Sequence, residues 1–190
     1  MSKSKGNVIN PLEVIDQYGA DAVRFALVYG TALGHDQALS YPKLDAMRKF
    51  TNKLWNMGRF IEMKRINSAK LIVQSNLTIE QLSNIAIHEN DKAMIEKTKN
   101  LAEDVTRLLD QYDFNHASQN LYDFAWHEFA DKYIEDVKNR IDENSSIILN
   151  SLFLILLKLL HPFMPFVTEE IAKQLKLTDT MIIVSPWPKK

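Results

Sequence analysis

The sequence predicts a mainly α-helical protein in which a mobile loop and a short α-rich connector precede an antiparallel helical bundle. Three observations support this prediction. Apolar residues recur at steps of three and four over long stretches, residues that favour helix starts precede those stretches, and only 5 Gly and 6 Pro interrupt 190 residues. We expect the loop and connector in residues 1–40, the bundle in 41–180 and an extended tail in 181–190.

The connector is expected to contain two short helices. Asn10 has the character of an N-cap, and Pro11 suits the first helical position, where no N–H is needed. Gly19 can end this helix in the left-handed conformation, and a second helix, AVRFALVYG, should end at Gly30. Residues 31–40 show no sustained period, so we place the domain boundary there.

The bundle should begin with a long helix over residues 43–65. At 100° per residue, Lys49, Lys53 and Lys64 fall nearly opposite its apolar stripe. This pattern predicts that one face of the helix is buried and that the opposite face is basic and exposed. A basic face that contacts only solvent and no partner explains the same pattern. The apolar stripe consists of Met47, Phe50, Thr51, Leu54, Trp55, Gly58 and Ile61.

Further helices are expected along the rest of the bundle. Thr78 and Gln81 have the spacing of a capping box, and Asp113 is suited to cap a later helix. The helix between them should carry the apolar stripe Met94, Thr98, Leu101, Val105, Leu108 and Tyr112. A last amphipathic helix, FVTEEIAKQL, should follow Pro165.

The most apolar stretch, residues 147–160, is expected to be a core helix. It is shorter than the ~20 apolar residues that a bilayer requires, and it contains Asn150 and Lys158. The preceding polar segment, residues 139–146, is expected to be an exposed loop. His161 follows the helix and precedes a proline, where its ring can donate to a free carbonyl group.

Composition excludes several classes of protein. The net charge of −1 argues against a protein that coats nucleic acid indiscriminately, but 11 Lys/Arg against 6 Asp/Glu in residues 1–70 give that part +5. The absence of cysteine excludes a disulfide scaffold and thiolate metal sites. Residues 1–30 lack the pattern of a signal peptide, so we expect a cytoplasmic protein that is not bound to a membrane.

Common catalytic and metal-binding patterns are missing from the sequence. It contains no phosphate-binding G-x-x-x-x-G-K-[ST], no G-x-G-x-x-G, no H-E-x-x-H and no G-x-S-x-G. The five histidines never take a metal-ligating spacing with one another, so no metal site is expected. Adjacent carboxylates such as Glu169 and Glu170 point about 100° apart on a helix and do not share a site.

The opening residues nevertheless carry a family resemblance. MSKSKGN resembles the second signature of class I aminoacyl-tRNA synthetases, K-M-S-K-S, without its leading lysine. NVINPLEVIDQYGADAVRFALV is similar to the segment that follows in that family, over about twenty positions. Within the class, the chain is most similar to the valyl-tRNA synthetases, in Gly34-His35-Asp36, NKLWNMGRF at 52–60, FADKYIE at 129–135, LLHPFMPFVTEEIAKQL at 159–175 and SPWP at 185–188.

The resemblance implies a catalytic role for Lys3. In the family, the corresponding lysine stabilises the pyrophosphate side of ATP while the carboxylate of the amino acid attacks the α-phosphorus. A positioned ammonium acts more strongly as negative charge moves onto the leaving phosphates. The expected ATP-binding residues are Ser2, Lys3, Ser4 and Lys5, and ATP would be bound with Mg²⁺ in the full-length enzyme.

The resemblance also implies that the parent protein is longer. The H-x-G-H signature, the nucleotide-binding sheet, the amino-acid pocket and the editing domain lie upstream in the family, and H-x-G-H is absent from this sequence. A lysine directly before Met1, preceded by a nucleotide-binding fold, would make Met1 an internal residue. The chain alone should hold no cofactor and form no aminoacyl-adenylate, whereas the full enzyme should be a monomer that attaches valine to tRNA(Val).

The tRNA-handling part remains, and the resemblance places the stem-contacting connector in residues 8–40 and the anticodon-binding domain in 41–180. Unpaired anticodon bases favour aromatic stacking, polar side chains that reach base edges, and cations on the phosphates. Arg59 is the leading base-contact residue by this analogy, and Trp55 is assigned to the core in preference to a stacking role. The expected tRNA-binding residues are Lys49, Asn52, Lys53, Trp55, Asn56 and Arg59.

Three other interpretations remain open. The chain could be a helical RNA-binding module without a catalytic role, a protein-interaction domain whose basic face is only solvated, or the same region of an isoleucyl- or leucyl-type synthetase. The presence of the catalytic loop argues against the first interpretation. Salt-dependent tRNA binding distinguishes the first from the second, because phosphate contacts make affinity fall steeply with salt.

Overall fold

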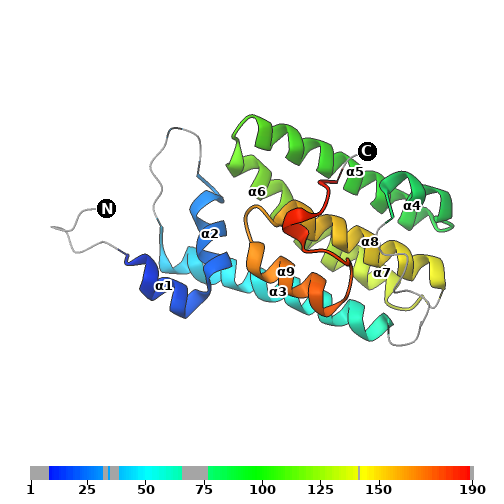
Figure 1. Cartoon of the computed structure of the whole chain (residues 1–190), viewed down its shortest axis with the longest axis horizontal. Coiled ribbons are helices and arrows are strands. Elements are labelled where there is room, and N and C mark those ends of the chain that lie inside the picture. Colours follow the sequence, from blue (N-terminus) through cyan, green and yellow to red (C-terminus); the bar gives the residue numbers. More distant parts are fainter. Residues whose placement is uncertain (1–8, 32–33, 35–38, 66–76, 141, 189–190) are drawn as a thin grey trace.

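The computed structural model describes residues 9–31, 34, 39–65, 77–140 and 142–188, and these residues are helical with no β-strand among them. Two short helices lie at one end of the molecule and an elongated helical bundle forms the rest (Figure 1). The predicted α-helical class is therefore confirmed.

The short helices of the connector are α1, Pro11–Tyr18, and α2, Ala20–Val28. Asn10 caps α1 as predicted, because its side-chain oxygen accepts the N–H of Leu12 at 3.1 Å. Gly19 joins the two helices with φ 87° and ψ 149°, so it has positive φ as expected but not the left-handed helical ψ. Only glycine adopts that combination without strain.

The first helix of the bundle is α3, Tyr41–Arg65. Its predicted apolar stripe faces the core, with Met57 as an additional buried residue and with Thr51 and Trp55 half-buried. Gly58 allows a close approach to α9, Pro165–Gln174, because a Cβ at that position would lie 3.0 Å from Ile171 Cγ2. Close packing of two helices thus accounts for this glycine.

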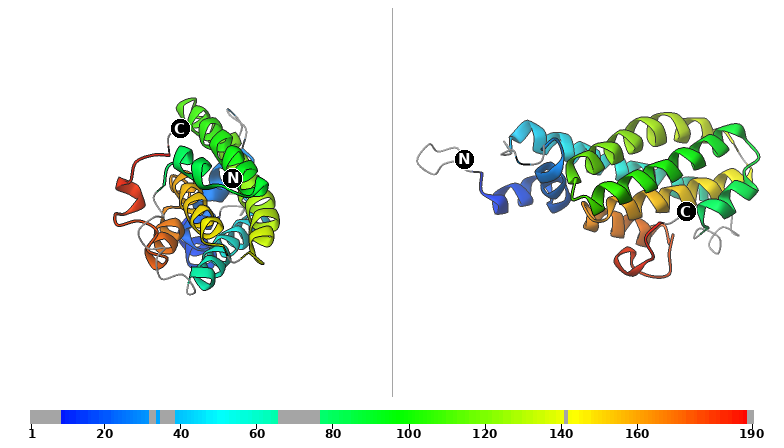
Figure 2. Two further views of the ribbon diagram at one scale, coloured as in Figure 1. Left: turned by 90° about the vertical axis from the view of Figure 1, so that its right-hand side faces the viewer. Right: turned by 90° about the horizontal axis from the view of Figure 1, so that it is seen from above.

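The remaining long helices surround a central one. Helix α5 is Glu89–Asp110, and a continuous rod joins α6 (Phe114–Asp123), a π-helical segment η3 (Phe124–Ile134) and α7 (Glu135–Val137). Helix α8, Glu143–Leu160, lies in the middle of the bundle, in contact with α3, α5, α6 and α9 (Figure 2). The short helix α4, Ile79–Ile85, and the 3₁₀ turn η4, Ile182–Val184, complete the described elements.

Helix α8 is a core helix, as predicted. It is the helix of the described ranges that is long and apolar enough to cross a membrane, by length and composition alone, but 78% of it is buried inside the protein. Burial on all sides explains why its sequence is hydrophobic around the whole circumference.

Two predictions about helix ends in the bundle were wrong. Tyr112 does not continue the stripe of α5, because the helix ends at Asp110 and Tyr112 is 72% exposed with φ 58°. Within residues 139–146, the part from Glu143 onward is not an exposed loop but the first turn of α8: Asp142 caps this helix by accepting the N–H of Ser145 at 2.8 Å, and Ser145 is buried. The polar side chains of this segment cap the start of α8 and form hydrogen bonds in the protein interior.

A buried polar cluster explains part of that error. The carboxylate of Asp91, fully buried, accepts hydrogen bonds from Tyr133 Oη at 2.9 Å, Arg140 Nη1 at 2.8 Å and Ser145 Oγ at 3.0 Å. Burial raises the pKa of the Tyr133 hydroxyl, and the neighbouring Asp91 carboxylate raises it further. A buried charge is tolerated here because it is paired and hydrogen-bonded. The cluster joins α5, η3 and α8.

Candidate nucleic-acid interface

The outer face of α3 carries four of the six predicted tRNA-binding residues in an exposed row. The side chains of Lys49, Asn52, Asn56 and Arg59 are all exposed. Their spacing of three, four and three residues puts them on one side of the helix. We call these four residues the α3 ridge. It offers two cations and two amides along about 15 Å of a rigid helix, at 1.5 Å per residue.

Three side chains of the ridge are available for a partner. Within the part of the chain that the structure describes, Asn52, Asn56 and Arg59 make no side-chain hydrogen bond or ion pair. An amide can donate and accept at a base edge, and a guanidinium can donate a fork of hydrogen bonds to a base or a phosphate. These residue types in one row suit single-stranded nucleic acid.

Lys49 is the fourth member of the ridge and has one internal partner. Its ammonium lies 2.9 Å from Asp45 one turn earlier, and the Lys49 side chain is 67% exposed. The Lys49 and Arg48 hydrogen bonds lower the pKa of Asp45. An exposed pair of this kind contributes little to stability, so a phosphate can replace Asp45 as the partner of Lys49 at small cost.

Lys53 lies beside the ridge and is already compensated. Its Nζ is 2.8 Å from Asp131 Oδ1 and 5.2 Å from the centre of the Trp126 ring, and its side chain is only 30% exposed. Lys53 therefore joins α3 to η3. To contact tRNA, Lys53 would have to give up or share its interactions with Asp131 and Trp126. Arg59 has no such internal interaction to lose within the described part of the chain.

Trp55 lies at the opposite border of the ridge, toward α9. It is half-buried and packs against the hydrophobic core. The recess that it lines with Arg59 and Leu175 has a volume of only about 10 Å³, too small for a base. This position is the one expected for a core residue and leaves little ring surface for stacking.

Lys64 does not belong to the basic outer face, contrary to the sequence prediction. Its Nζ donates to the backbone carbonyls of Val137 and Arg140, the latter at 2.6 Å. Burial lowers the pKa of this amine. Lys64 satisfies free carbonyls at the end of α7, a tertiary contact that helical periodicity in α3 does not reveal.

An aromatic group beside Lys53 was missed from the sequence. The rings of Tyr122 and Trp126 stack with centroids 5.6 Å apart, and Tyr29 and Phe50 lie 5.2 Å and 4.7 Å from Tyr122. Tyr122, Trp126 and Tyr29 are half-buried. The i, i+4 spacing of Tyr122 and Trp126 was the available signal, but Tyr29 joins them only through folding.

The predicted ATP-binding residues Ser2, Lys3, Ser4 and Lys5 lie outside the described residues. Within the described ranges no group of three or more His, Asp or Glu side chains is arranged to hold a metal ion. The site that the structure presents is therefore the α3 ridge.

Comparison with known families identifies two regions of the chain. Residues 91–190 match the family described as "Anticodon-binding domain of tRNA ligase", and residues 1–40 match "tRNA synthetases class I (I, L, M and V)". The ridge lies between these two matched regions.

Curated relatives match the whole chain. Valine–tRNA ligase of Dehalococcoides mccartyi strain CBDB1 is 42% identical over 99% of this chain and 21% of the relative. The valine–tRNA ligases of Fervidobacterium nodosum and Thermotoga maritima are 41% and 40% identical over 100% of the chain, again 21% of each relative. The chain thus spans about a fifth of the length of these proteins.

A solved structure has the same fold. The crystal structure of the ternary complex of Agrobacterium radiobacter K84 agnB2 LeuRS-tRNA-LeuAMS matches with a TM-score of 0.78 and covers 99% of this chain and 22% of that one. At 24% identity this likeness concerns the fold.

Proposed function

The chain belongs to the family of anticodon-binding domains of tRNA ligases, and we propose that it is the tRNA-binding part of a valine–tRNA ligase. The parent enzyme would activate valine with ATP and attach it to tRNA(Val). The observation that carries this proposal is the identity of about 40% with valine–tRNA ligases along the entire chain.

The proposed contact surface for the anticodon loop is the α3 ridge. Its amides and Arg59 suit the edges of unpaired bases, and Lys49 suits the backbone phosphates. Lys53 and Trp55 border this surface as secondary candidates. A helix packed on one side against α8 and α9 holds the ridge rigidly, which limits the entropy lost on binding.

The proposed catalytic contribution of the chain is confined to its first residues. Lys3 would hold the phosphates of ATP, which enters the parent enzyme with Mg²⁺, and the small residues Ser2 and Ser4 would leave room for the phosphates, with Lys5 next to them. Lysine suits this task because its point charge sits on a flexible stem. We expect no ATP–pyrophosphate exchange by the isolated chain, and robust exchange would contradict this assignment.

The proposed partners are tRNA(Val) for the chain, and valine and ATP through the rest of the parent enzyme. We expect the parent enzyme to be a monomer and to act in the cytoplasm, where these substrates are found. A charging assay with purified tRNAs specific for valine, isoleucine and leucine tests the substrate directly. Charging of tRNA(Ile) or tRNA(Leu) in preference to tRNA(Val) would favour the isoleucyl- or leucyl-type alternative.

The residue assignment is tested by Arg59→Ala in the full-length enzyme. Loss of a guanidinium contact to a base should raise KM for tRNA(Val) about tenfold or more, equivalent to ~1–3 kcal/mol, while KM for valine stays unchanged. Arg107→Ala is the matched control, because Arg107 is an exposed arginine on α5, away from the ridge. Equal tRNA kinetics in wild type and Arg59→Ala would remove Arg59 from the interface.

A further inference from the structure

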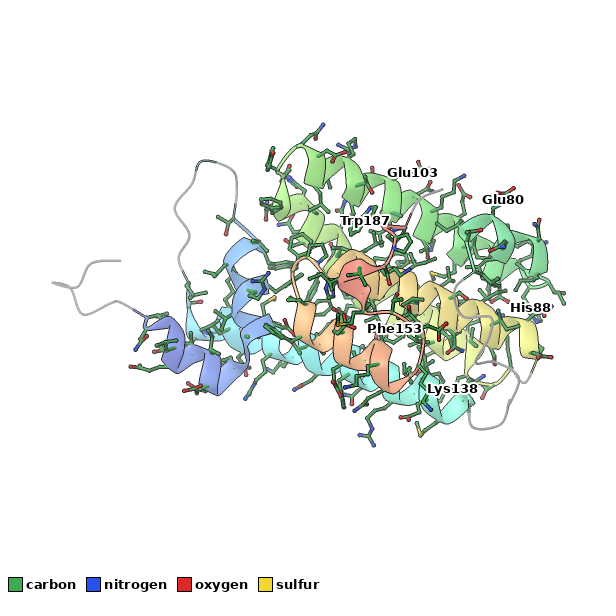
Figure 3. All side chains as sticks on the ribbon, in the orientation of Figure 1. Glu80, His88, Glu103, Lys138, Phe153 and Trp187 are labelled. Atoms are coloured by element: carbon green, nitrogen blue, oxygen red, sulfur yellow. The ribbon has the colours of Figure 1, made fainter. Side chains whose placement is uncertain are left out.

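The exposed stripe of the α3 ridge continues along the helix toward the connector. At 100° per residue, Tyr41 and Arg48 fall within about 20° of Arg59 around the helix axis, and both side chains are exposed, Tyr41 by 54%. Figure 3 shows side chains along the outer edge of α3, from the connector helices to the end of the bundle where Lys138 lies. The stripe therefore reaches from Arg59 to the first turn of α3.

Two cations in this stripe converge on one carboxylate. Asp45 Oδ1 lies 2.8 Å from Arg48 Nη2, and Asp45 Oδ2 lies 2.9 Å from Lys49 Nζ. A guanidinium and an ammonium that meet at one pair of anionic oxygens have the arrangement that suits a phosphate. The three side chains lie on one turn of an exposed helix, where such ion pairs contribute little to stability. Stability thus gives little reason for this arrangement.

An aromatic ring from the connector holds the guanidinium of Arg48. The Cζ atom of Arg48 lies 5.6 Å from the centre of the Tyr18 ring on α1, and the centres of the Tyr18 and Tyr41 rings are 6.5 Å apart. Within the described ranges only Nη2 of Arg48 donates a hydrogen bond, so its other nitrogens keep donors for a ligand. A guanidinium that stacks on an aromatic face loses less entropy when it binds an anion.

The charge of α3 suits a polyanion. The helix contains seven Lys or Arg against two Asp or Glu, whereas residues 71–190 contain 12 Lys or Arg against 18 Asp or Glu. A protein partner would need a matching row of acidic side chains along the stripe. The backbone of RNA supplies a negative charge at every nucleotide, so it is the partner that this helix fits best.

The course of the tRNA follows from the two ends of the proposed interface, so this step rests on the proposed function. The anticodon loop is assigned to the ridge, and the proposed catalytic residue Lys3 precedes α1, which lies at the connector end of the molecule (Figure 1). A tRNA that reaches both places must run along α3 toward the connector. Its paired anticodon stem would then pass the first half of α3.

We infer that Arg48 and Lys49 bind a backbone phosphate of the paired anticodon stem, with Tyr41 beside them, and that Asp45 takes the place of this phosphate when no RNA is bound. Arg48 precedes Arg59 by about 16 Å of helix, at 1.5 Å per residue, which separates this contact from the loop. Asp45 opposes binding, because its carboxylate competes with the phosphate for the same two cations. Paired RNA is recognised mainly through its phosphates and 2′-hydroxyls, so this contact reads no base sequence.

Asp45→Asn in the full-length enzyme distinguishes this role from a structural one. Asparagine keeps the size of the side chain and removes the competing charge, so tRNA(Val) should bind about threefold more tightly. The slope of log K against log salt should become steeper, because both cations can then neutralise phosphate. Asp104→Asn is the matched control, since Asp104 pairs with Arg107 three residues later on an exposed face of α5, at 3.1 Å.

Arg48→Ala locates the contact on the stem. The variant should weaken tRNA(Val) binding about tenfold and reduce the salt slope by about 0.9, whereas Arg107→Ala should change neither. The loss should be the same for a tRNA(Val) whose anticodon-stem base pairs are reversed, because phosphates carry no sequence. Ethylation of one or two stem phosphates should hinder binding to wild type but not to Arg48→Ala, and interference at loop phosphates should persist.

Four results would overturn the inference. Unchanged affinity and slope in Arg48→Ala would exclude the stem contact, and the proposed function would stand if Arg59→Ala still impaired tRNA kinetics. Interference that Arg48→Ala removes only at loop phosphates would place the contact on the loop, and a loss that depends on the order of the stem base pairs would show that bases are read. Equal affinity in wild type and Asp45→Asn, or equal tightening by Asp104→Asn, would refute the role of Asp45.

Discussion

The carboxylate of Asp21 on α2 accepts the backbone N–H of Val167 at 2.6 Å and thereby caps α9 from a different helix. Its other oxygen accepts the N–H of Phe166 at 3.2 Å. One turn further along α2, Arg24 donates to the carbonyls of Pro162 and Phe163. The connector is thus fastened to the turn between α8 and α9 through free backbone groups at both helix ends.

Replacement of Asp21 by asparagine should destabilise the protein. Burial raises the pKa of Asp21, whereas the hydrogen bonds from the two N–H groups lower it. These hydrogen bonds therefore favour the ionised carboxylate of Asp21 over the protonated acid. Asparagine has one acceptor oxygen, so one N–H would be left without its partner, at a cost of about 1–3 kcal/mol. Urea unfolding of Asp21→Asn against the exposed control Asp16→Asn measures this destabilisation. Equal midpoints would contradict it.

Removal of Arg140 should have a larger effect. Arg140 is the charged partner of the fully buried Asp91 at 2.8 Å, and its own side chain is only 14% exposed. Arg140→Met would leave a buried carboxylate without its cation and should lower the free energy of unfolding by about 3–5 kcal/mol. Arg107→Met breaks an exposed pair with Asp104 and should cost only about 0–1 kcal/mol. A comparable destabilisation in both variants would refute the proposed importance of the buried cluster.

The cap of α6 should contribute stability that depends on pH. Asp113 accepts the N–H of His116 at 3.2 Å, and hydrogen bonds from the His116 ring and its N–H lower the pKa of the carboxyl group. A lowered pKa in the folded state means that the contribution is complete above the unfolded value of 3.8 and disappears as the pH falls through the folded value.

Asp113→Ala should therefore be less stable than wild type by about 1 kcal/mol near neutral pH. The difference should shrink in acid, because protonated Asp113 no longer acts as a strong acceptor. Thermal unfolding of both proteins between about pH 2 and pH 7 provides the measurement. A difference that stays constant over this range would show that the charge of Asp113 plays no part.

Local features of the fold could be predicted from the sequence. Asn10, Thr78 and Asp113 cap helices as expected, because capping depends on residues two or three positions apart. The stripe of α3 was predicted because helical periodicity is also local. Tyr112 was assigned wrongly because a positive φ after a helix is not visible in a three-and-four pattern.

The remaining features depend on interactions between distant residues. Asp91 and Arg140 are 49 positions apart, so the polar segment around Arg140 looked like a loop until folding paired it with α5. Lys64 was placed on the outer face for the same reason, since its partners lie at the end of α7 and just beyond it. The ridge from Lys49 to Arg59 was predictable because it lies on one helix, whereas the contact of Tyr29 with Tyr122 depends on the tertiary structure.

The central claim, that the α3 ridge binds tRNA, is tested most directly by the salt dependence of tRNA(Val) binding to the full-length enzyme. If Lys49 and Arg59 contact tRNA, the double variant Lys49→Ala with Arg59→Ala should bind tRNA(Val) more weakly. For each phosphate that the variant no longer neutralises, the slope of log K against log salt should fall by about 0.7–0.9. The exposed lysines Lys92 and Lys138 provide the control pair. An unchanged affinity and slope in the ridge variant, or an equal weakening in the control pair, would contradict the account.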